Sequence, residues 1–358
     1  MSSFDYGNAR IRAMKSHLLS QRELESLTNV GNIKGLIARL NKTAYHKAID
    51  AALARTIGID CIIWALHHDL IERLGKFQEF YQDQAGEMVS IVLRKYDIHN
   101  LKTILRGLTK NVPLKEILAS TLPVGKLDYG TLDELAHAPD PRASIDLLAT
   151  MGSPFAQPLL KLRLDHPGAE TDEMELTLDQ WHFQDAFQEL QHARSDGNVL
   201  RSALEVEADL INLLSALRFA HAPGERKFLH EWLGTDELDH IFVGPGKLSF
   251  SLLALACSQD SVEAAVENFT ETTYERSLRA GLASYVHSSR LSDFEKQLNS
   301  YRLEWMSRQI TNDPLGIGVI LGYLALKMNE VTNIRWIAQG INLELKPDAI
   351  RREMVFAS

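Results

Sequence analysis

The sequence predicts an all-α protein built from three similar helical-bundle subdomains. Apolar residues recur at spacings of three and four almost throughout the 358 residues, while alternation with a period of two is nearly absent. Proline-containing turns such as those at Pro113, Pro154 and Pro314 separate windows of helical length. A polar motif that occurs three times in diverged form indicates that one helical module is repeated.

The repeated motif places a carboxylate three residues before an asparagine. Its three copies are Asp97 with Asn100, Asp209 with Asn212, and Glu330 with Asn333. An aliphatic residue follows each asparagine directly. Two positions after the asparagine, the first copy has Lys102, the third has Arg335 and the second has the uncharged Leu214. We take the carboxylates, the asparagines and Arg335 as structural or interface candidates.

A second pattern keeps register with the first. Gly125-Lys-Leu recurs at Gly246-Lys-Leu, and Asp5-Tyr-Gly matches Asp128-Tyr-Gly. With Asp5, Asp128 and Ser249 as repeat starts, the asparagine follows its start at the same distance in the second and third copies. The predicted subdomains are residues 1–124, 125–245 and 246–358. No flexible linker separates them, so we expect them to pack as one rigid body.

The windows between the turns predict individual helices. The first subdomain should contain long helices around residues 9–28, 31–56, 58–82 and 84–107. In the second, the acidic and turn-rich stretch 165–175 predicts a solvated loop. The third should close with a short helix that starts near Pro347.

The carboxylate and the amide lie on or beside apolar helical stripes, so both should be buried. An unsatisfied buried polar group costs about 1–3 kcal/mol, which means that each must find a partner. The pairs either fix how the three subdomains meet or contact a neighbouring protein, or they tie down a loop or helix end inside their own subdomain. The second interpretation is favoured, and neither makes the pair catalytic.

Composition narrows the class of protein. The chain is 45% hydrophobic and 24% charged with a net charge of −9, and it has no basic run, so nucleic acid is a disfavoured partner. Cys61 and Cys257 lie in apolar runs without a Cys-x-x-Cys motif, which favours buried thiols in a reducing compartment. The N-terminus lacks signal-peptide features, and the most apolar stretch, 314–326, is short of the roughly 20 residues that span a bilayer.

Motifs for phosphate, dinucleotide and metal binding fail on inspection. Around Gly246 the phosphate-loop pattern lacks its first glycine and its Ser or Thr, and Gly316, Gly318 and Gly322 have the wrong spacing for a dinucleotide fingerprint. We expect turns or close helix contacts there. The cluster at residues 67–69 is interpreted as a surface or helix-face group rather than a metal site. The sequence therefore predicts no catalytic residue, cofactor or metal.

One enzyme class stays open as a remote alternative. Glu134 with His137, Glu189 with His192, and Glu237 with His240 have the Glu-x-x-His spacing of di-metal carboxylate bundles. These pairs lie in polar segments, and prolines follow His137 closely. A second alternative, from another class, is an all-helical repeat adaptor or scaffold.

Three stretches resemble one known family. Residues 100–107 (Asn-Leu-Lys-Thr-Ile-Leu-Arg-Gly), 313–337 and 6–10 (Tyr-Gly-Asn-Ala-Arg) are similar to signatures of the central-stalk subunits of rotary V-type and archaeal or bacterial A/V-type ATPases, known by the letter C in prokaryotes and d in eukaryotes. The resemblance covers essentially the whole chain. The middle copy departs most, because Phe219 stands where the first copy has Gly107.

The resemblance implies an all-helical funnel around a pseudo-threefold axis. Such a protein caps the membrane proteolipid rotor ring, receives the foot of the central axle (the D/F-type stalk) and transmits torque without an active site or cofactor. It would lie on the cytoplasmic face of the membrane as a peripheral part of the complex, with no membrane span of its own.

Overall fold

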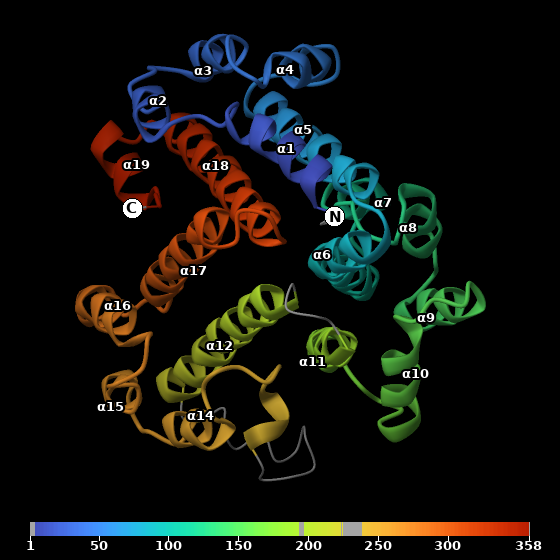
Figure 1. The fold of residues 1–358 in the computed structure, drawn as a ribbon. Helices are drawn as coiled ribbons and strands as arrows, with labels where there is room; N and C mark the ends of the chain where they lie inside the picture. Colours follow the sequence, from blue (N-terminus) through green and yellow to red (C-terminus); the bar gives the residue numbers. More distant parts are fainter. Residues whose placement is uncertain (1–3, 193–196, 223, 225–237, 358) are drawn as a thin grey trace. The chain divides into compact units, whose positions relative to one another are not determined.

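The computed structural model describes residues 4–192, 197–222, 224 and 238–357, and every regular element in these ranges is a helix (Figure 1). The predicted all-α class is therefore confirmed. None of the described helices combines the length and the apolar character that crossing a membrane requires.

The chain divides into two compact units, residues 1–90 with 303–358, and residues 91–302. The first unit therefore joins the two ends of the chain. The chain passes between the units within two helices, α6 (Asp83–Thr109) and α17 (Ser292–Asn312).

In the first unit, α18 (Gly318–Asn342) packs against most of the other helices. Other helices of this unit are α1 (Asp5–Lys15), α2 (Gln21–Leu27), α3 (Ile33–Leu40), α4 (His46–Leu53), α5 (Ile59–Phe80) and α19 (Pro347–Glu353). Helices α1, α2, α3, α5 and α19 all contact α18 (Figure 1). Its buried Val331, Ile334 and Ile337 share one apolar core with side chains of α2 to α5.

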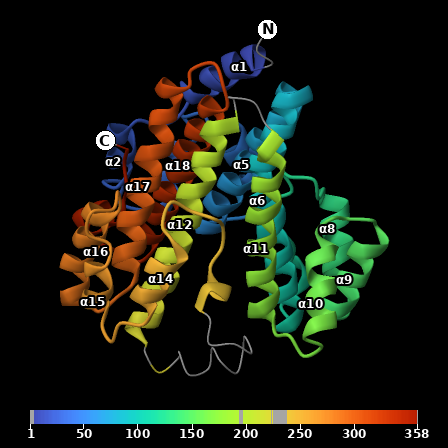
Figure 2. The same cartoon turned by 60° about the horizontal axis from the view of Figure 1, so that its bottom comes forward.

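The second unit places short helices along long ones. Its elements after α6 are α7 (Leu114–Ala119), α8 (Tyr129–Ala136), α9 (Pro141–Thr150), α10 (Ala156–Asp165), α11 (Thr171–Glu189), η1 (Leu190–His192), α12 (Gly197–His221), η3 (Leu238–Ile241), α14 (Phe250–Cys257), α15 (Val262–Glu267) and α16 (Glu275–Ser288). Helices α8, α9 and α10 follow one another in contact and lead to α11, while α14 and α15 pack along α12 (Figure 2).

Two predicted long helices are wrong because each is a pair of short ones. The stretch 9–28 breaks before α2, where the Ser20 side chain accepts a hydrogen bond from the N–H of Glu23 and the Glu23 carboxylate accepts one from the N–H of Ser20. The stretch 31–56 breaks at Thr43, whose hydroxyl accepts a bond from the N–H of the buried Tyr45. The predicted helices 58–82 and 84–107 are confirmed as α5 and α6.

The acidic stretch 165–175 was predicted to be a loop, but its second part is the start of a helix. Helix α11 begins at Thr171, because Glu170 and Glu173 form a reciprocal capping box at its start. Carboxylates in the first turn of a helix are favoured by the helix dipole, so the acidic composition signalled a helix start as well as solvation. The short helix predicted near Pro347 is confirmed as α19.

The same succession of helix starts occurs three times along the chain. In each set, one capping side chain begins a helix and a second capping side chain begins the next helix. The spacing between these two caps is the same in all three sets. A buried aromatic residue then precedes a third helix. The three sets are Ser20, Asn32 and Tyr45; Asp128, Asp140 and Phe155; and Ser249, Ser261 and Tyr274. This recurrence supports three repeats of one helical module.

The first repeat starts later than the sequence pattern indicates. Asp5 lies inside the first turn of α1 and caps no helix, whereas Ser20 caps α2 as Asp128 caps α8 and Ser249 caps α14. Helix α1 therefore precedes the first repeat. The match between Asp5-Tyr-Gly and Asp128-Tyr-Gly was misleading because it equates residues with different roles.

Candidate functional site: clamps between successive repeats

Each asparagine of the repeated motif holds the backbone of one later residue at two points. Asn100 donates to the carbonyl of Leu122 (2.8 Å) and accepts from its N–H (2.6 Å). Asn212 makes the same pair of bonds with Val243 (2.8 and 2.9 Å). Asn333 makes them with Val355 (2.8 and 3.1 Å). We call this arrangement the amide clamp.

The first two carboxylates of the motif hold the segment that follows. Asp97 accepts hydrogen bonds from the N–H groups of Lys126 and Leu127, both at 2.9 Å. Leu127 directly precedes the residue that caps α8. We call this arrangement, in which a carboxylate binds the N–H just before a helix cap, the carboxylate clamp.

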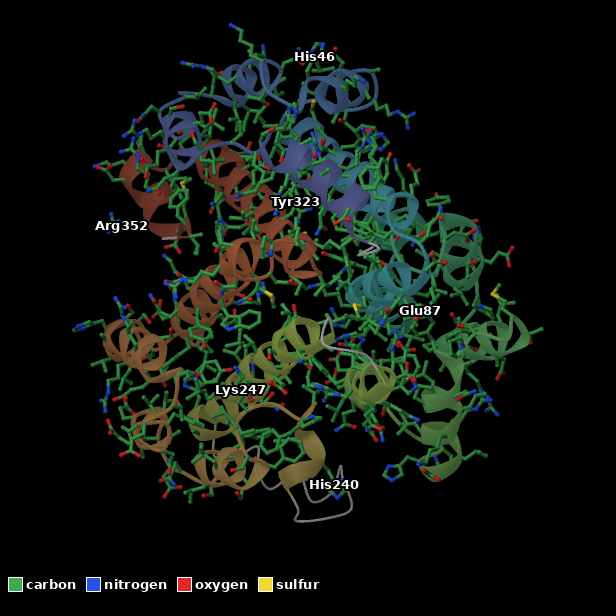
Figure 3. The ribbon with its side chains drawn as sticks, in the orientation of Figure 1. His46, Glu87, His240, Lys247, Tyr323 and Arg352 are labelled. Carbon is green, nitrogen blue, oxygen red and sulfur yellow. The ribbon has the colours of Figure 1, made fainter. Side chains whose placement is uncertain are left out.

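Asp209 repeats the carboxylate clamp one repeat later. It accepts from the N–H groups of Lys247 and Leu248, both at 3.0 Å, just before Ser249 caps α14. Lys247 is labelled in Figure 3 within the segment that leads into α14. The buried hydroxyl of Tyr274 adds a third bond to Asp209 at 2.7 Å. Phe155, which precedes the third helix of the second repeat, has no hydroxyl to offer Asp97.

The carboxylate clamps explain the repeated glycine before Lys-Leu. A Cβ atom on Gly125 would lie 2.2 Å from a carboxylate oxygen of Asp97, and one on Gly246 would lie 1.9 Å from Asp209. No side chain fits at either position unless the carboxylate moves. The Gly-Lys-Leu motif is thus a close-approach site for a carboxylate and not a phosphate loop.

Burial sets the protonation behaviour of these carboxyl groups. Desolvation raises the pKa of Asp97 to about 6, and the two backbone N–H donors, which favour the carboxylate, offset only part of that rise. Desolvation also raises the pKa of Asp209, although its backbone and tyrosine donors oppose the shift.

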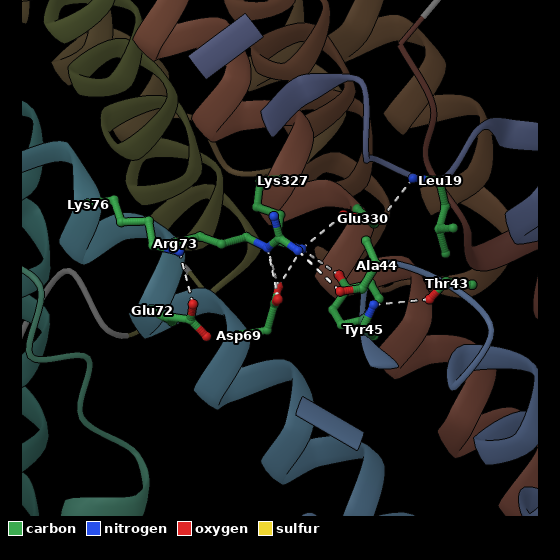
Figure 4. A network of polar contacts seen from close by, with 10 residues as sticks. All are labelled: Leu19, Thr43, Ala44, Tyr45, Asp69, Glu72, Arg73, Lys76, Lys327 and Glu330. Atoms are coloured by element: carbon green, nitrogen blue, oxygen red, sulfur yellow. Dashed lines mark hydrogen bonds and ion pairs between the residues drawn. The ribbon is translucent and has the colours of Figure 1, made fainter. Parts of the chain in front are cut away.

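The third carboxylate reaches back to the start of the chain. Glu330 on α18 accepts a hydrogen bond at 2.9 Å from the N–H of Leu19, which directly precedes the cap of α2 at Ser20 (Figure 4). Here His17 stands at the place that Gly125 holds before Leu127, and the carboxylate side chain is one methylene longer. Only one of its oxygens binds the backbone.

The second oxygen of Glu330 belongs to a buried charge network that Figure 4 shows. The Lys327 ammonium lies 3.1 Å from Glu330 and 2.8 Å from Asp69, and it donates to the Tyr45 hydroxyl at 2.7 Å. It also lies 4.2 Å from the centroid of the Tyr45 ring. Desolvation and the nearby carboxylates raise the pKa of Tyr45 well above its ordinary value, so its hydroxyl stays protonated.

The network reaches α5 through Asp69, which Arg73 binds through its Nε atom at 2.8 and 2.9 Å. Two cations thus face two carboxylates, which is the condition under which buried charges are tolerated. The sequence placed Asp69 in a surface or helix-face cluster. The cluster does lie on a helix, α5, but the Asp69 side chain is buried while His68 is exposed. The missed signal was Lys327, which lies three residues before Glu330 on the same helical stripe.

The sequence left open whether the motif acts between subdomains or inside its own subdomain, and the two types of clamp differ in this respect. The amide clamps hold Leu122, Val243 and Val355, each inside the predicted subdomain of its asparagine. The carboxylate clamps cross to the next predicted subdomain, from Asp97 to Leu127 and from Asp209 to Leu248. Glu330 does so from the third repeat to the first. Both interpretations therefore describe part of the motif.

Arg335 joins neither type of clamp. It is half-buried on α18, and its buried Nε atom has no hydrogen-bond partner within the described part of the chain. Lys102, which holds the same place in the first copy, forms an ion pair with Asp179 at 2.6 Å.

The N-terminal signature is explained by a second set of close contacts. A Cβ atom on Gly7 would lie 2.1 Å from the ring of Tyr81, so this helix turn needs glycine. The buried Asn8 donates to the carbonyl of Gly316 (3.0 Å) and accepts from the Tyr81 hydroxyl (2.8 Å). Arg12 donates to the carbonyl of Pro314 (2.6 Å). Helix α1 thereby holds the turn that leads into α18.

The remaining glycines and cysteines have structural surroundings. Gly316 approaches the Asp313 carboxylate, and Gly318 and Gly322 approach backbone carbonyls of α17, as expected for a turn and a close helix contact. The side chains of Cys61 and Cys257 are both buried, as the sequence predicted.

The Glu-x-x-His pairs show no common site in the described residues. Glu134 and His137 are exposed on α8 and just after it. Glu237 and the side chain of His192 lie outside the described residues. Among the side chains that the structure describes, no group of three or more His, Cys, Asp or Glu could hold a metal ion.

Comparison with known proteins gives one consistent result. The model of a family described as ATP synthase (C/AC39) subunit matches residues 7–353. The chain is 27% identical over 356 residues to the C subunit of the A-type ATP synthase of Haloferax volcanii, a match that covers 99% of this chain and 98% of that protein. It is 29% identical over 361 residues to the protein of the same name from Methanococcoides burtonii, with coverage of 99% and 94%.

Proposed function

The chain belongs to the ATP synthase (C/AC39) subunit family, and from that membership we propose that it is a non-catalytic central-stalk subunit of a rotary A-type ATP synthase. In this proposal it joins the axle of the complex to the membrane rotor ring and transmits torque between them. Its work is mechanical, and ATP is bound and turned over by other subunits.

The observation that carries the mechanical part of the proposal is the series of clamps. A torque-transmitting body must resist shear where one helical module meets the next. The carboxylate clamps of Asp97, Asp209 and Glu330 fasten each repeat to the start of another through hydrogen bonds of 2.9–3.0 Å to buried or part-buried backbone groups. Groups in a close-packed interior have low compressibility and pass strain on, so clamps of this kind suit a stiff coupling element.

The proposed partners follow from the same role. On one side the chain would contact the axle subunits of the D/F-type stalk, and on the other the proteolipid ring. It would lie on the inner face of the membrane and be held there by the complex.

The proposal is tested by removing the chain from its complex. In membranes that contain the complex without this chain, we expect ATP hydrolysis to continue while ATP-driven ion transport is lost, because axle and ring are no longer joined. Adding the purified chain back should restore transport. If hydrolysis and transport both persist without the chain, the proposed function is wrong.

A matched control separates coupling from general damage to the membranes. The added chain is supplied either as the wild type or with Gly168→Ala, a loop substitution whose new Cβ meets nothing within 4 Å. Both should restore transport to the same extent. Addition of an unrelated helical protein should restore none.

A further inference from the structure

One face of α18 is open along much of its length. The exposed or half-buried positions that recur there at helical spacing are Ala325, Met328, Thr332, Arg335, Trp336, Gln339 and Leu343, the last being the residue that ends the helix. We call these residues the α18 stripe. Trp336 is 45% exposed and Leu343 is 68% exposed, so two of its large side chains are apolar and open to solvent.

Arg335 is the single charged side chain on the α18 stripe. The other two charged residues of this fully described helix, Lys327 and Glu330, are buried and paired with each other. The Nε atom of Arg335 is buried without a hydrogen-bond partner among the described residues, and burial lowers its pKa without any opposing carboxylate. A buried N–H donor without an acceptor is energetically costly.

The other repeats show what this position needs when it is charged. In the first copy Lys102 has its counter-ion within the chain, Asp179 at 2.6 Å. In the second copy the position is Leu214, which needs none. Only the third copy combines a cation with an open apolar surface and no carboxylate beside it. No ion pair joins Arg335 to a carboxylate of the described residues, so a carboxylate for it would have to come from another chain.

We propose that the α18 stripe is a docking surface for an amphipathic helix of a neighbouring subunit. That helix brings a carboxylate to Arg335 and apolar side chains to Trp336 and Leu343. The inference rests on the proposed function, because it takes the neighbour to be another subunit of the same ATP synthase complex. It goes beyond that function by assigning the contact residues and the chemistry of the partner.

The chemistry of the α18 stripe favours a helical protein segment. Open positions repeat at helical spacing from Ala325 to Leu343, which suits a second helix lying alongside. Tryptophan and arginine are the residues that most often dominate protein interfaces, and one arginine among apolar neighbours matches one carboxylate on the partner. The unpaired guanidinium supplies the complementary charge that a bare apolar face would lack.

A thiol-labelling experiment tests whether the α18 stripe is covered in the complex. Both native cysteines are fully buried, so Trp336→Cys would introduce the one readily accessible thiol of the described chain. The variant is treated with a maleimide reagent, once as the free chain and once within the intact complex. We expect labelling to be on the order of 10-fold slower or more in the complex. Equal labelling rates in the two states would overturn the proposal.

Charge reversal at Arg335 tests the carboxylate. Purified wild-type, Arg335→Lys and Arg335→Glu chains are titrated onto membranes whose complex lacks this chain. Arg335→Glu should bind on the order of 30-fold more weakly or worse, because truncation or reversal at a buried charge pair has effects of this size. Arg335→Lys should retain most of the affinity, since it keeps the charge.

Different results would contradict the proposed function and the docking surface. If the wild-type chain does not bind these membranes, the proposed function fails and the docking surface with it. If the wild type binds and Arg335→Glu binds equally tightly, the α18 stripe is not the docking surface, while the proposed function stands.

Discussion

Asp97 should make the second compact unit less stable at neutral than at acidic pH. Its pKa is about 6 in the folded chain against an ordinary value of 3.8. Between these values the folded chain binds more protons than the unfolded chain, so the free energy of unfolding falls as pH rises. The contribution is fully present below pH 3.8 and is lost as pH passes 6. The shift corresponds to about 3 kcal/mol.

The prediction is measured as a difference between two proteins. Urea unfolding, followed by circular dichroism from about pH 4 to about pH 7.5, gives the free energy of unfolding of the wild type and of Asp97→Asn, which cannot ionise. The wild-type value minus the variant value should fall by about 2.5 kcal/mol across this range, because part of the full shift lies below pH 4. Asp128→Asn is the control with the opposite sign, since a bond from the N–H of Thr131 lowers the pKa of Asp128. A wild-type minus Asp97→Asn difference that is constant or rises with pH would refute the reasoning.

Three further substitutions probe the clamps and the charge network by urea unfolding. Gly246→Ala places a Cβ atom 1.9 Å from a carboxylate oxygen and should cost about 1–3 kcal/mol of stability, whereas Gly168→Ala, with open space around it, should change stability by less than about 0.5 kcal/mol. Tyr274→Phe removes a buried hydroxyl bond to a carboxylate and should cost about 1.5–3 kcal/mol; an unchanged midpoint would mean that this bond contributes nothing. Lys327→Met leaves the buried Glu330 carboxylate without its cation and leaves Asp69 paired with Arg73 alone. It should cost about 3–5 kcal/mol, and adding Glu330→Leu should recover part of that loss.

The sequence predicts the polar residues of the clamps well because burial makes them conspicuous. A carboxylate and an amide on an apolar helical stripe must find partners, and Asp97 and Asn100 do. Their partners could not be named in advance. They are backbone groups in turns some distance along the chain, and backbone groups carry no sequence signal of their own. Gly125 was the available clue, since its glycine marks the close approach of the carboxylate.

The start of the first repeat shows a different limit. The match between two short sequences favoured Asp5 as the start of the first repeat. The capping box of Ser20 and Glu23 could be recognised in the sequence, and it marks the helix start that is equivalent to those of the other repeats. The buried network of Lys327, Asp69 and Tyr45 joins residues that lie far apart in the chain. Its members could be recognised individually, yet only the fold brings them together.

If the clamps serve a mechanical task, opening one of them should reduce the number of ions transported per ATP hydrolysed. The complex is assembled with the wild-type chain or with Asp209→Asn, which cannot accept from both N–H groups of Lys247 and Leu248. Faster hydrogen exchange at the Leu248 amide verifies that the clamp has opened. The account predicts unchanged ATP hydrolysis with fewer ions moved per ATP. An opened clamp with the same number of ions moved per ATP would contradict it.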